Sequence, residues 1–259
     1  MEQNVEKLRK DLLLEENTLK TLEKVLSVVE SSSKACELFW KADELVFVLF
    51  QNFIDSFYTL NTELFDEGEM HKIKLCIDIL TNIAQKIKIE EFFLKLQLDY
   101  YIYPFLMSSG DESIKISTLK LFSALLKDER HEGMRISELL PLILKIVDSG
   151  SEECQILALE TLGLVLIGNG LDYAVQTIDR FRAIDVVLNP LVKRSVLSKN
   201  LIFLKQLLKI YTRLCDHNNV RMKVREKPPE GLDSKEMMSL CERDEELLSI
   251  WTKFMHTLN

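Results

Sequence analysis

Residues that break helices are scarce in this chain, with 8 glycines and 5 prolines among 259 residues. The long segments between them carry apolar residues at helical spacing, and hydrophobic residues make up 47% of the chain. That share is typical of a globular protein and excludes a disordered one. The length allows a sizeable core, in one elongated domain or in two ordinary ones. The sequence therefore predicts an all-α fold.

Motifs of catalytic and metal sites are also missing. The 4 histidines are isolated, and no H-x-x-x-H or H-E-x-x-H spacing occurs. Around Cys215, Asp216 and His217, adjacent helical side chains point in different directions, so these residues do not form a ligand set. The chain has neither a G-x-S-x-G elbow nor a Cys/His nucleophile arrangement. We expect no enzymatic activity, no metal and no cofactor.

Disulfide and membrane signals are absent as well. The 5 cysteines (Cys36, Cys76, Cys154, Cys215 and Cys241) are odd in number and form no C-x-x-C pair. Most fall on apolar helical stretches, which favours buried reduced thiols in a reducing compartment. Residues 1–7 lack the apolar core of a signal peptide, and no apolar run approaches the ~18 residues of a membrane span. We expect a soluble cytoplasmic protein, with the nucleus as an alternative, and no membrane partner.

The net charge of -8 is unevenly spread. Between Pro190 and Lys227, ten basic residues stand against only Asp216 and Glu226, a local balance of +8, so the remainder carries -16. Such a segment indicates either an anion-binding patch or solvated helix faces rich in lysine, and both interpretations stay open. The basic residues are Lys193, Arg194, Lys199, Lys205, Lys209, Arg213, Arg221, Lys223, Arg225 and Lys227.

The N-terminal segments read as long helices. Residues 2–30 predict one helix with heptad spacing and Glu15 in its seam, either a cap on a helical stack or a short coiled coil. Residues 34–58 predict a second helix, dense in aromatic residues. Residues 61–69 predict a loop that contains Gly68, and residues 70–88 predict a helix with one buried stripe.

An internal repeat then recurs three times. Each copy has a proline followed by apolar residues, a polar turn and a long apolar helix. The prolines Pro104, Pro141 and Pro190 are 37 and 49 residues apart, which brackets the ~40–47 residues of armadillo and HEAT repeats. The polar turns are residues 108–111, 148–151 and 198–200.

The repeat has a physical basis. Proline is tolerated in the first turn of a helix, and Ser, Asp or Asn in the turn can cap the helix that follows. Residues 168–170 predict a C-cap and turn with a left-handed glycine. Because each helix pair exposes an apolar face that a neighbouring repeat must cover, we expect an armadillo/HEAT-like α-solenoid, a right-handed superhelix of stacked helical repeats. The concave face of a solenoid is normally a binding surface.

The C-terminal part begins after residues 228–231, which break the helix. Asp233 or Ser234 is expected to cap a short helix, and a last helix over residues 243–258 either folds back to close the solenoid or forms a detachable tail. We divide the chain into an N-terminal helix (1–33), an armadillo-repeat domain (34–232) and C-terminal helices (233–259).

Residues 98–225 resemble the required-for-cell-differentiation (Rcd/Caf) family, the armadillo-type subunit of the CCR–NOT cytoplasmic deadenylase complex. The similarity extends more faintly to Trp40 and Trp251. The matching motifs, in the order and at about the spacing of the family, are Tyr103-Pro104-Phe105-Leu106, Asp148-Ser149-Gly150-Ser151-Glu152, Gly170-Leu171-Asp172-Tyr173, Arg180-Phe181 and Tyr211-Thr212-Arg213-Leu214-Cys215-Asp216.

The resemblance implies a non-catalytic adaptor that docks on the large Not scaffold and helps messenger RNA deadenylation, decay and translational repression. The scaffold contact would lie on the helix that begins near Trp40, at Lys41, Asp43, Phe47, Phe50 and Ile54. Only Ile54 has a residue type close to the usual one in the family. A generic armadillo or HEAT interaction adaptor is the alternative, and homodimer formation is left open.

The resemblance also implies pockets that accept tryptophans of silencing proteins. Here Arg180 is retained, whereas Ile178, Asn219 and Lys223 replace a tyrosine, an arginine and an alanine. We therefore expect a degenerate pocket and weak or absent binding of tryptophan motifs.

A nucleic-acid groove is the third implication of the resemblance, and peptides of silencing or RNA-binding adaptors are alternative occupants. Its expected residues are Arg180, Lys205, Lys209, Arg213, Arg221 and Arg225, and binding of single-stranded RNA there should weaken with salt.

Overall fold

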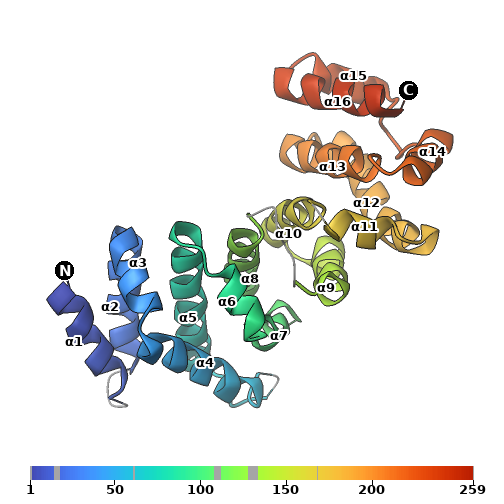
Figure 1. The fold of residues 1–259 in the computed structure, drawn as a ribbon. Helices are drawn as coiled ribbons and strands as arrows, with labels where there is room; N and C mark the ends of the chain where they lie inside the picture. The colour runs from blue at the N-terminus through green and yellow to red at the C-terminus, as the bar shows by residue number, and fades with distance from the viewer. Residues whose placement is uncertain are drawn as a thin grey trace. The chain divides into compact units, whose positions relative to one another are not determined.

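The structure is a computed structural model that describes residues 2–14, 18–60, 62–107, 112–127, 134–167 and 169–258. Within these ranges the regular elements are α-helices and one short 3₁₀ helix, which confirms the all-α prediction (Figure 1). The chain divides into two compact units, residues 1–127 and residues 128–259. The predicted division at residues 33 and 232 stays a prediction.

The first unit is built on three helices that pack in succession, α2 on α5 and α5 on α8. They begin at Thr18, Glu67 and Glu112, which are 49 and 45 residues apart. The elements in chain order are α1 (Glu2–Leu12), α2 (Thr18–Ser31), α3 (Ser33–Trp40), α4 (Asp43–Phe57), α5 (Glu67–Lys86), α6 (Glu90–Lys95), the 3₁₀ helix η2 (Leu98–Tyr101), α7 (Tyr103–Met107) and α8 (Glu112–Leu125).

The second unit repeats this arrangement, with α10 on α13 and α13 on α16. These helices begin at Glu152, Leu201 and Glu245, which are 49 and 44 residues apart. The elements are α9 (Ile136–Ser149), α10 (Glu152–Val165), α11 (Asn169–Val175), α12 (Ile178–Ser198), α13 (Leu201–Leu214), α14 (Asn218–Glu226), α15 (Lys235–Cys241) and α16 (Glu245–Leu258). Both units thus have the recurring helical packing that the sequence repeat predicted.

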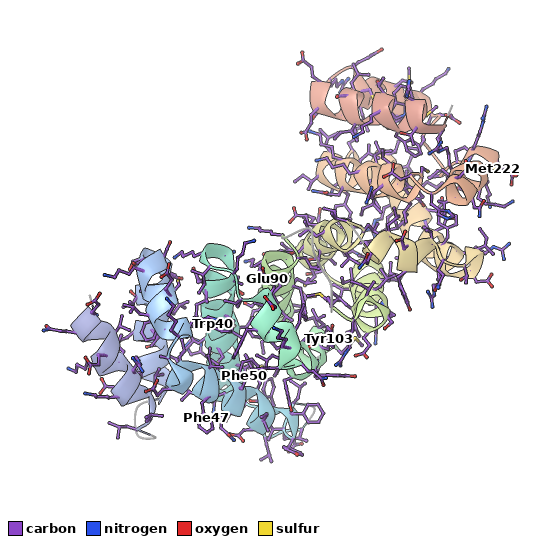
Figure 2. All side chains as sticks on the ribbon, in the orientation of Figure 1. Trp40, Phe47, Phe50, Glu90, Tyr103 and Met222 are labelled. Carbon is purple, nitrogen blue, oxygen red and sulfur yellow. The ribbon has the colours of Figure 1, made fainter. Side chains whose placement is uncertain are left out.

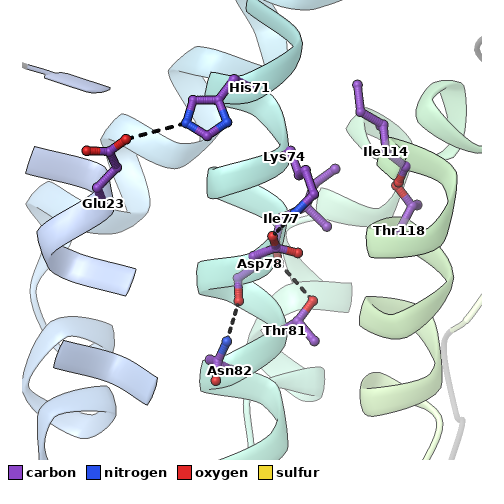
Figure 3. A network of polar contacts seen from close by, with 9 residues as sticks. All are labelled: Glu23, His71, Lys74, Ile77, Asp78, Thr81, Asn82, Ile114 and Thr118. Atoms are coloured by element: carbon purple, nitrogen blue, oxygen red, sulfur yellow. Dashed lines mark hydrogen bonds and ion pairs between the residues drawn. The ribbon is translucent and has the colours of Figure 1, made fainter. Parts of the chain in front are cut away.

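Helices α2, α5 and α8 present polar groups alongside their apolar contacts (Figure 3). His71 on α5 lies 3.5 Å from Glu23 on α2. The buried hydroxyls of Thr81 and Thr118 donate to carbonyl oxygens one turn earlier in their own helices, at 2.8 and 2.7 Å. These bonds satisfy the two buried hydroxyls within their own helices.

The N-terminal segment is two helices, so the prediction of one helix over residues 2–30 is wrong. α1 ends at Leu12, α2 begins at Thr18, and the two pack against each other. The seam position Glu15 lies outside the described residues. In α2, Val25 is fully buried, whereas Leu19 is 36% exposed. The hairpin buries both apolar faces within one chain, and α1 covers α2, α3 and α4 as a cap does.

The aromatic segment is also two helices, and the prediction of one helix over residues 34–58 is wrong. α3 ends at Trp40 and α4 begins at Asp43. Between them Ala42 is extended, with φ -98° and ψ 113°, and only 1% exposed. The chain turns at this buried alanine, where no glycine or proline marks a break.

Two of the three repeat prolines lie inside helices rather than in a first turn. Pro104 is the second residue of α7, as expected. Pro141 lies within α9 and Pro190 within the 21-residue α12. A proline there removes one backbone hydrogen bond, and burial of the surrounding apolar residues outweighs that loss. In the polar turns, Ser151 and Asn200 cap α10 and α13 as predicted, whereas residues 108–111 lie outside the described part.

Two glycine-containing turns also differ from the predictions. Asp66 caps α5, so Gly68 falls in the first turn of that helix and the predicted loop is shorter. Gly168 is not described, and Gly170 lies inside α11 without a left-handed backbone. A Cβ atom on Gly170 would sit 1.7 Å from the carbonyl oxygen of Val165. The reason for glycine there is close backbone approach.

The C-terminal helices are docked on the second unit. Ser234 caps α15, as predicted, by accepting a hydrogen bond from the backbone N–H of Met237 at 3.2 Å. α16 packs against α13, α14 and α15, with Leu247 and Phe254 fully buried. The last helix is thus packed against the rest of the second unit, and its role in closing the solenoid stays a prediction.

Candidate protein-interaction surfaces

An exposed aromatic stripe runs along α4. Phe47 is 62% exposed, and Phe57 and Tyr58 at the end of the helix are 54% and 79% exposed. Phe47, Ile54 and Tyr58 are spaced by seven and four residues, and with about 100° per residue they share one face. We call Phe47, Ile54, Phe57 and Tyr58 the α4 stripe. It has no partner among the described residues that would cover it.

The six residues predicted to contact a scaffold do not share one helix. Trp40 is the last residue of α3, and the exposed Lys41 follows it. The helix therefore begins at Asp43, three residues later than predicted, and nothing is described of the Asp43 side chain. Phe47 and the half-buried Ile54 belong to the stripe.

Phe50 has a different role from its neighbours on α4. Figure 2 marks its position on α4. Phe50 is only 8% exposed, and its ring lies 5.6 Å from the ring of Phe53 and 6.4 Å from that of Phe93. Phe50 therefore joins α4 to α6 and does not present its ring to a partner. The scaffold contact itself stays a prediction.

A second exposed apolar group lies on α6 and η2, which we call the α6 ridge. Phe92, Leu96, Tyr100 and Tyr101 are 44%, 50%, 45% and 39% exposed. The ring of Trp40 meets that of Phe92 edge-on, at 5.4 Å and 81°. Sequence reasoning missed this ridge. The signal that could have revealed it is the four-residue spacing of Phe92, Leu96 and Tyr100.

Carboxylates at the start of α16 form ion pairs with two lysines of the basic segment. Lys205 Nζ lies 2.8 Å from Asp244 and 2.7 Å from Glu246, and Lys209 lies 3.6 Å from Glu246. The hydrogen bond from Lys205 lowers the pKa of both carboxyl groups. The sequence count had placed these acids outside the segment.

Three further cations of the segment are ion-paired, but two of their acids, Asp216 and Glu226, are already counted in the balance of +8. The acids that come from outside the segment are Glu230, Asp244 and Glu246, and they reduce the balance to +5. The pairs are Lys193–Glu230 at 2.9 Å, Arg213–Asp216 at 2.6 Å and Lys223–Glu226 at 2.7 Å. Arg221 donates through Nε to the carbonyl oxygen of Cys215 at 2.9 Å. Five of the ten cations thus have a carboxylate within ion-pair distance among the described residues, and both interpretations of the segment stay open.

A hollow of about 710 Å³ lies between α10, α13 and α16. Of the six residues predicted for a groove, Lys209 and Arg213 line it, whereas Arg180, Lys205, Arg221 and Arg225 do not. Gly163 also lines the hollow, and a Cβ atom added to it would meet no other atom within 4 Å. A larger side chain at this position would therefore extend into the open space of the hollow. The other lining residues are Glu160, Leu164, Ile167, Gln206, Ile210, Thr212, Asp216, Ile250, Lys253 and Thr257.

The four residues of the degenerate tryptophan pocket lie on two helices. Ile178 and Arg180 are in the first turn of α12, and Asn219 and Lys223 are on α14. The guanidinium of Arg180 lies 3.9 Å over the ring of Tyr173 and donates to the carbonyl oxygen of the same residue at 3.2 Å. The guanidinium of Arg180 therefore stacks on one ring and donates a hydrogen bond within its own unit. Weak or absent binding of tryptophan motifs stays a prediction.

The cysteines are buried, as predicted. Burial raises the pKa of Cys76 and of Cys215 to about 12, which disfavours the reactive thiolate at neutral pH.

Among the residues that the structure describes, no group of three or more His, Cys, Asp or Glu could hold a metal ion. In the same part of the chain, no single helix is long and apolar enough to cross a membrane. Only α10 and α11 together, bent by 102°, reach that length and composition.

Known proteins with similar sequences include two yeast proteins. The Schizosaccharomyces pombe protein called cell differentiation protein rcd1 is 28% identical over 203 residues, 75% of this chain and 72% of its own length. Protein CAF40 of Saccharomyces cerevisiae is 23% identical over 191 residues, 70% of this chain and 51% of its own length. The chain thus spans about half of the budding-yeast relative.

Solved structures with a similar fold include designed armadillo repeat proteins. One, designed for modular peptide recognition, has a TM-score of 0.71 at 14% identity and covers 99% of both chains. Another, in complex with the peptide (KR)4, has a TM-score of 0.66 at 14% identity and covers 98% of both. At this identity they show the fold alone, an armadillo-type α-solenoid.

The family itself is shown by the sequence. The model of the family described as "Cell differentiation family, Rcd1-like" matches residues 5–258. Its match reaches both ends of the resemblance found from the motifs, and this family and fold are of a non-catalytic adaptor kind. The chain therefore belongs to the Rcd1-like cell differentiation family.

Proposed function

We propose that this chain is the adaptor subunit of a CCR–NOT-type deadenylase complex. It docks on the large Not scaffold and supports messenger RNA deadenylation, decay and translational repression in the cytoplasm. Family membership supports the complex, and the α4 stripe supports the docking. The stripe is the observation that carries the proposal, because it exposes large aromatic side chains where the resemblance places the scaffold contact.

The stripe is suited to a partner and has no evident use within the chain. Phe47 lies with 62% of its surface in water, and burying a phenylalanine side chain yields about 1.5–3 kcal/mol. Aromatic residues near the centre of an interface are the usual source of binding energy. A single substitution at Phe47 should therefore be decisive for scaffold binding.

The experiment is titration of the purified chain with a purified fragment of the Not scaffold. The wild type is expected to form a 1:1 complex, and Phe47→Ser is expected to weaken it roughly 10- to 100-fold, the equivalent of about 1.4–2.8 kcal/mol. Leu197→Ser is the matched control, because Leu197 is 65% exposed but lies on α12 in the other unit. Equal affinity of the Phe47 variant and the control would contradict docking through the stripe, and no complex with the wild type would contradict the function.

Peptides of silencing or RNA-binding adaptors are a second class of partner, and the hollow of the second unit favours them. It combines an apolar floor from Leu164, Ile210 and Ile250 with the cations Lys209 and Lys253 at its border. Gly163→Leu should fill part of this space and reduce binding of a partner that enters it, without affecting scaffold binding. Isothermal titration with such a peptide tests this separation of the two surfaces.

Nucleic-acid binding is a further proposal, and it is supported by fewer residues than the sequence predicted. Arg180, which contacts Tyr173, is one of three arginines of the predicted groove that have no carboxylate partner among the described residues. The other two, Arg221 and Arg225, lie together on α14, and Arg225 is exposed to solvent. If they bind single-stranded RNA, log Kd should rise linearly with log salt, and replacing both by alanine should reduce the slope by about 1.4, at ~0.7 per phosphate contact. Affinity that is independent of salt, or unchanged in the double variant, would exclude this activity.

A further inference from the structure

The hollow of the second unit has the size of a small-molecule site. Its volume of about 710 Å³ falls within the ~300–1,000 Å³ of pockets that hold small ligands. Three helices border it, and α13 packs between α10 and α16 (Figure 1). All the lining residues belong to residues 128–259, so the hollow forms within one compact unit and needs no partner chain.

Apolar side chains from all three helices line the hollow. Ile210 on α13 is buried at 1% exposure. Leu164 and Ile167 on α10 and Ile250 on α16 are only half-buried, so they keep apolar surface that a ligand can cover. Gly163 leaves open space beside Leu164, because it has no side chain there. The apolar body of a ligand therefore has both a surface to cover and room next to α10.

Five charged residues also line the hollow, and two of them neutralise each other. Arg213 and Asp216 form an ion pair at 2.6 Å. Lys209 is held less tightly, since it lies 3.6 Å from Glu246, a carboxylate that is only 2.7 Å from Lys205. The ammonium group of Lys209 can therefore turn toward a ligand at little cost.

The remaining charged residues are Lys253 and Glu160, and neither has an ion pair among the described residues. Lys253 on α16 and Lys209 on α13 stand on neighbouring helices, whereas Glu160 is on α10. The side of the hollow between α13 and α16 is therefore the more basic one. Two lysines against one carboxylate favour a ligand with a single negative charge.

These features together select the class of ligand. A cationic ligand would meet the two lysines, and a nucleic acid would leave the apolar lining uncovered and bring phosphates to Glu160. We propose that the hollow binds a small monocarboxylate with an apolar body. Its carboxylate lies between Lys209 and Lys253. Its apolar body covers Ile250 and Leu164 and extends toward Gly163.

The test is isothermal titration of the full chain with octanoate, octanol and octyltrimethylammonium, which share an alkyl chain and differ in charge. Lys253→Glu reverses one of the two lysines. Lys235→Glu is the matched control, because Lys235 is an exposed cation of the same unit that lies outside the hollow and has no ion pair in the described structure.

A pair of variants at Gly163 tests the apolar part of the site. Gly163→Leu fills the open space beside α10, whereas Gly163→Ala leaves most of it open. Neither Cβ atom meets another atom within 4 Å, so both variants should fold. Circular dichroism and thermal unfolding check the fold of every variant.

Octanoate is expected to bind the wild type at a ratio of 1:1, and octanol at least about tenfold more weakly, because octanol lacks the charge. Octyltrimethylammonium should not bind. Lys253→Glu should weaken octanoate binding about tenfold and Gly163→Leu should abolish it, while Lys235→Glu and Gly163→Ala stay within about twofold of the wild type.

Four outcomes would each overturn the inference. They are no binding of octanoate by the wild type, equal affinity for octanoate and octanol, unchanged affinity in Lys253→Glu, and unchanged affinity in Gly163→Leu. None of them bears on scaffold docking, because the α4 stripe belongs to the first unit.

Discussion

A substitution at Phe254 tests whether the packing of α16 contributes to the stability of the second unit. Its side chain is fully buried, and its ring lies 6.4 Å from that of Tyr211 on α13, at 62°. Tyr211 is itself buried, and its hydroxyl donates to Asp185 at 2.6 Å. Phe254→Ala would therefore open a cavity against the centre of the core rather than at its surface.

The expected cost of Phe254→Ala is about 3–5 kcal/mol in the free energy of unfolding of the second unit, because the transfer and cavity contributions add. Leu248→Ala is the control, since Leu248 lies on the same helix but is 43% exposed. Its expected cost is less than about 1 kcal/mol. A tail that is docked only part of the time would show a similar, small cost for both variants.

Urea denaturation measures the difference. The chain has 2 tryptophans, Trp40 in the first unit and Trp251 on α16. With Trp40→Phe as the background, the fluorescence of Trp251 reports the second unit. The midpoint should then fall by more than about 1 M urea in the Phe254 variant, at ~1–3 kcal/mol per M. A shift no larger than that of Leu248→Ala would refute the assignment of α16 to the core.

Three further outcomes are expected. Lys205 holds the pKa of Asp244 and of Glu246 low, so the stability from these pairs is present above about pH 4.5 and is lost as pH falls through the lowered values. Acid unfolding followed by circular dichroism should therefore be less steep in Lys205→Met than in the wild type, and identical profiles would show that the pairs contribute nothing. Gly170→Ala forces a Cβ atom against a backbone oxygen and should lower the thermal midpoint of the second unit by several degrees, while an unchanged midpoint would mean that the backbone relaxes freely. Titration with a tryptophan-containing peptide should give no measurable binding, and a tight complex abolished by Arg180→Ala would contradict the degenerate pocket.

Local patterns carried most of what the sequence predicted correctly. The spacing of apolar residues and the scarcity of glycine and proline indicated helices, because helix formation depends on residues three and four apart. Ser151, Asn200 and Ser234 were recognisable as caps since a cap bonds to the backbone only two or three residues ahead. The motif order between residues 98 and 225 was enough to indicate the family.

Contacts between distant residues decided the rest. Ala42 breaks the aromatic segment although nothing in its local sequence marks a break, and Pro190 stays within a 21-residue helix because the surrounding apolar face is buried. Part of the excess charge of the basic segment is offset because Lys205 pairs with two acids about 40 residues later in the chain. The sequence by itself determined helix content, caps and family. Only the tertiary structure decided which aromatic residues stay in water and which charges are neutralised, because exposure and ion pairing depend on what the rest of the chain places beside each side chain.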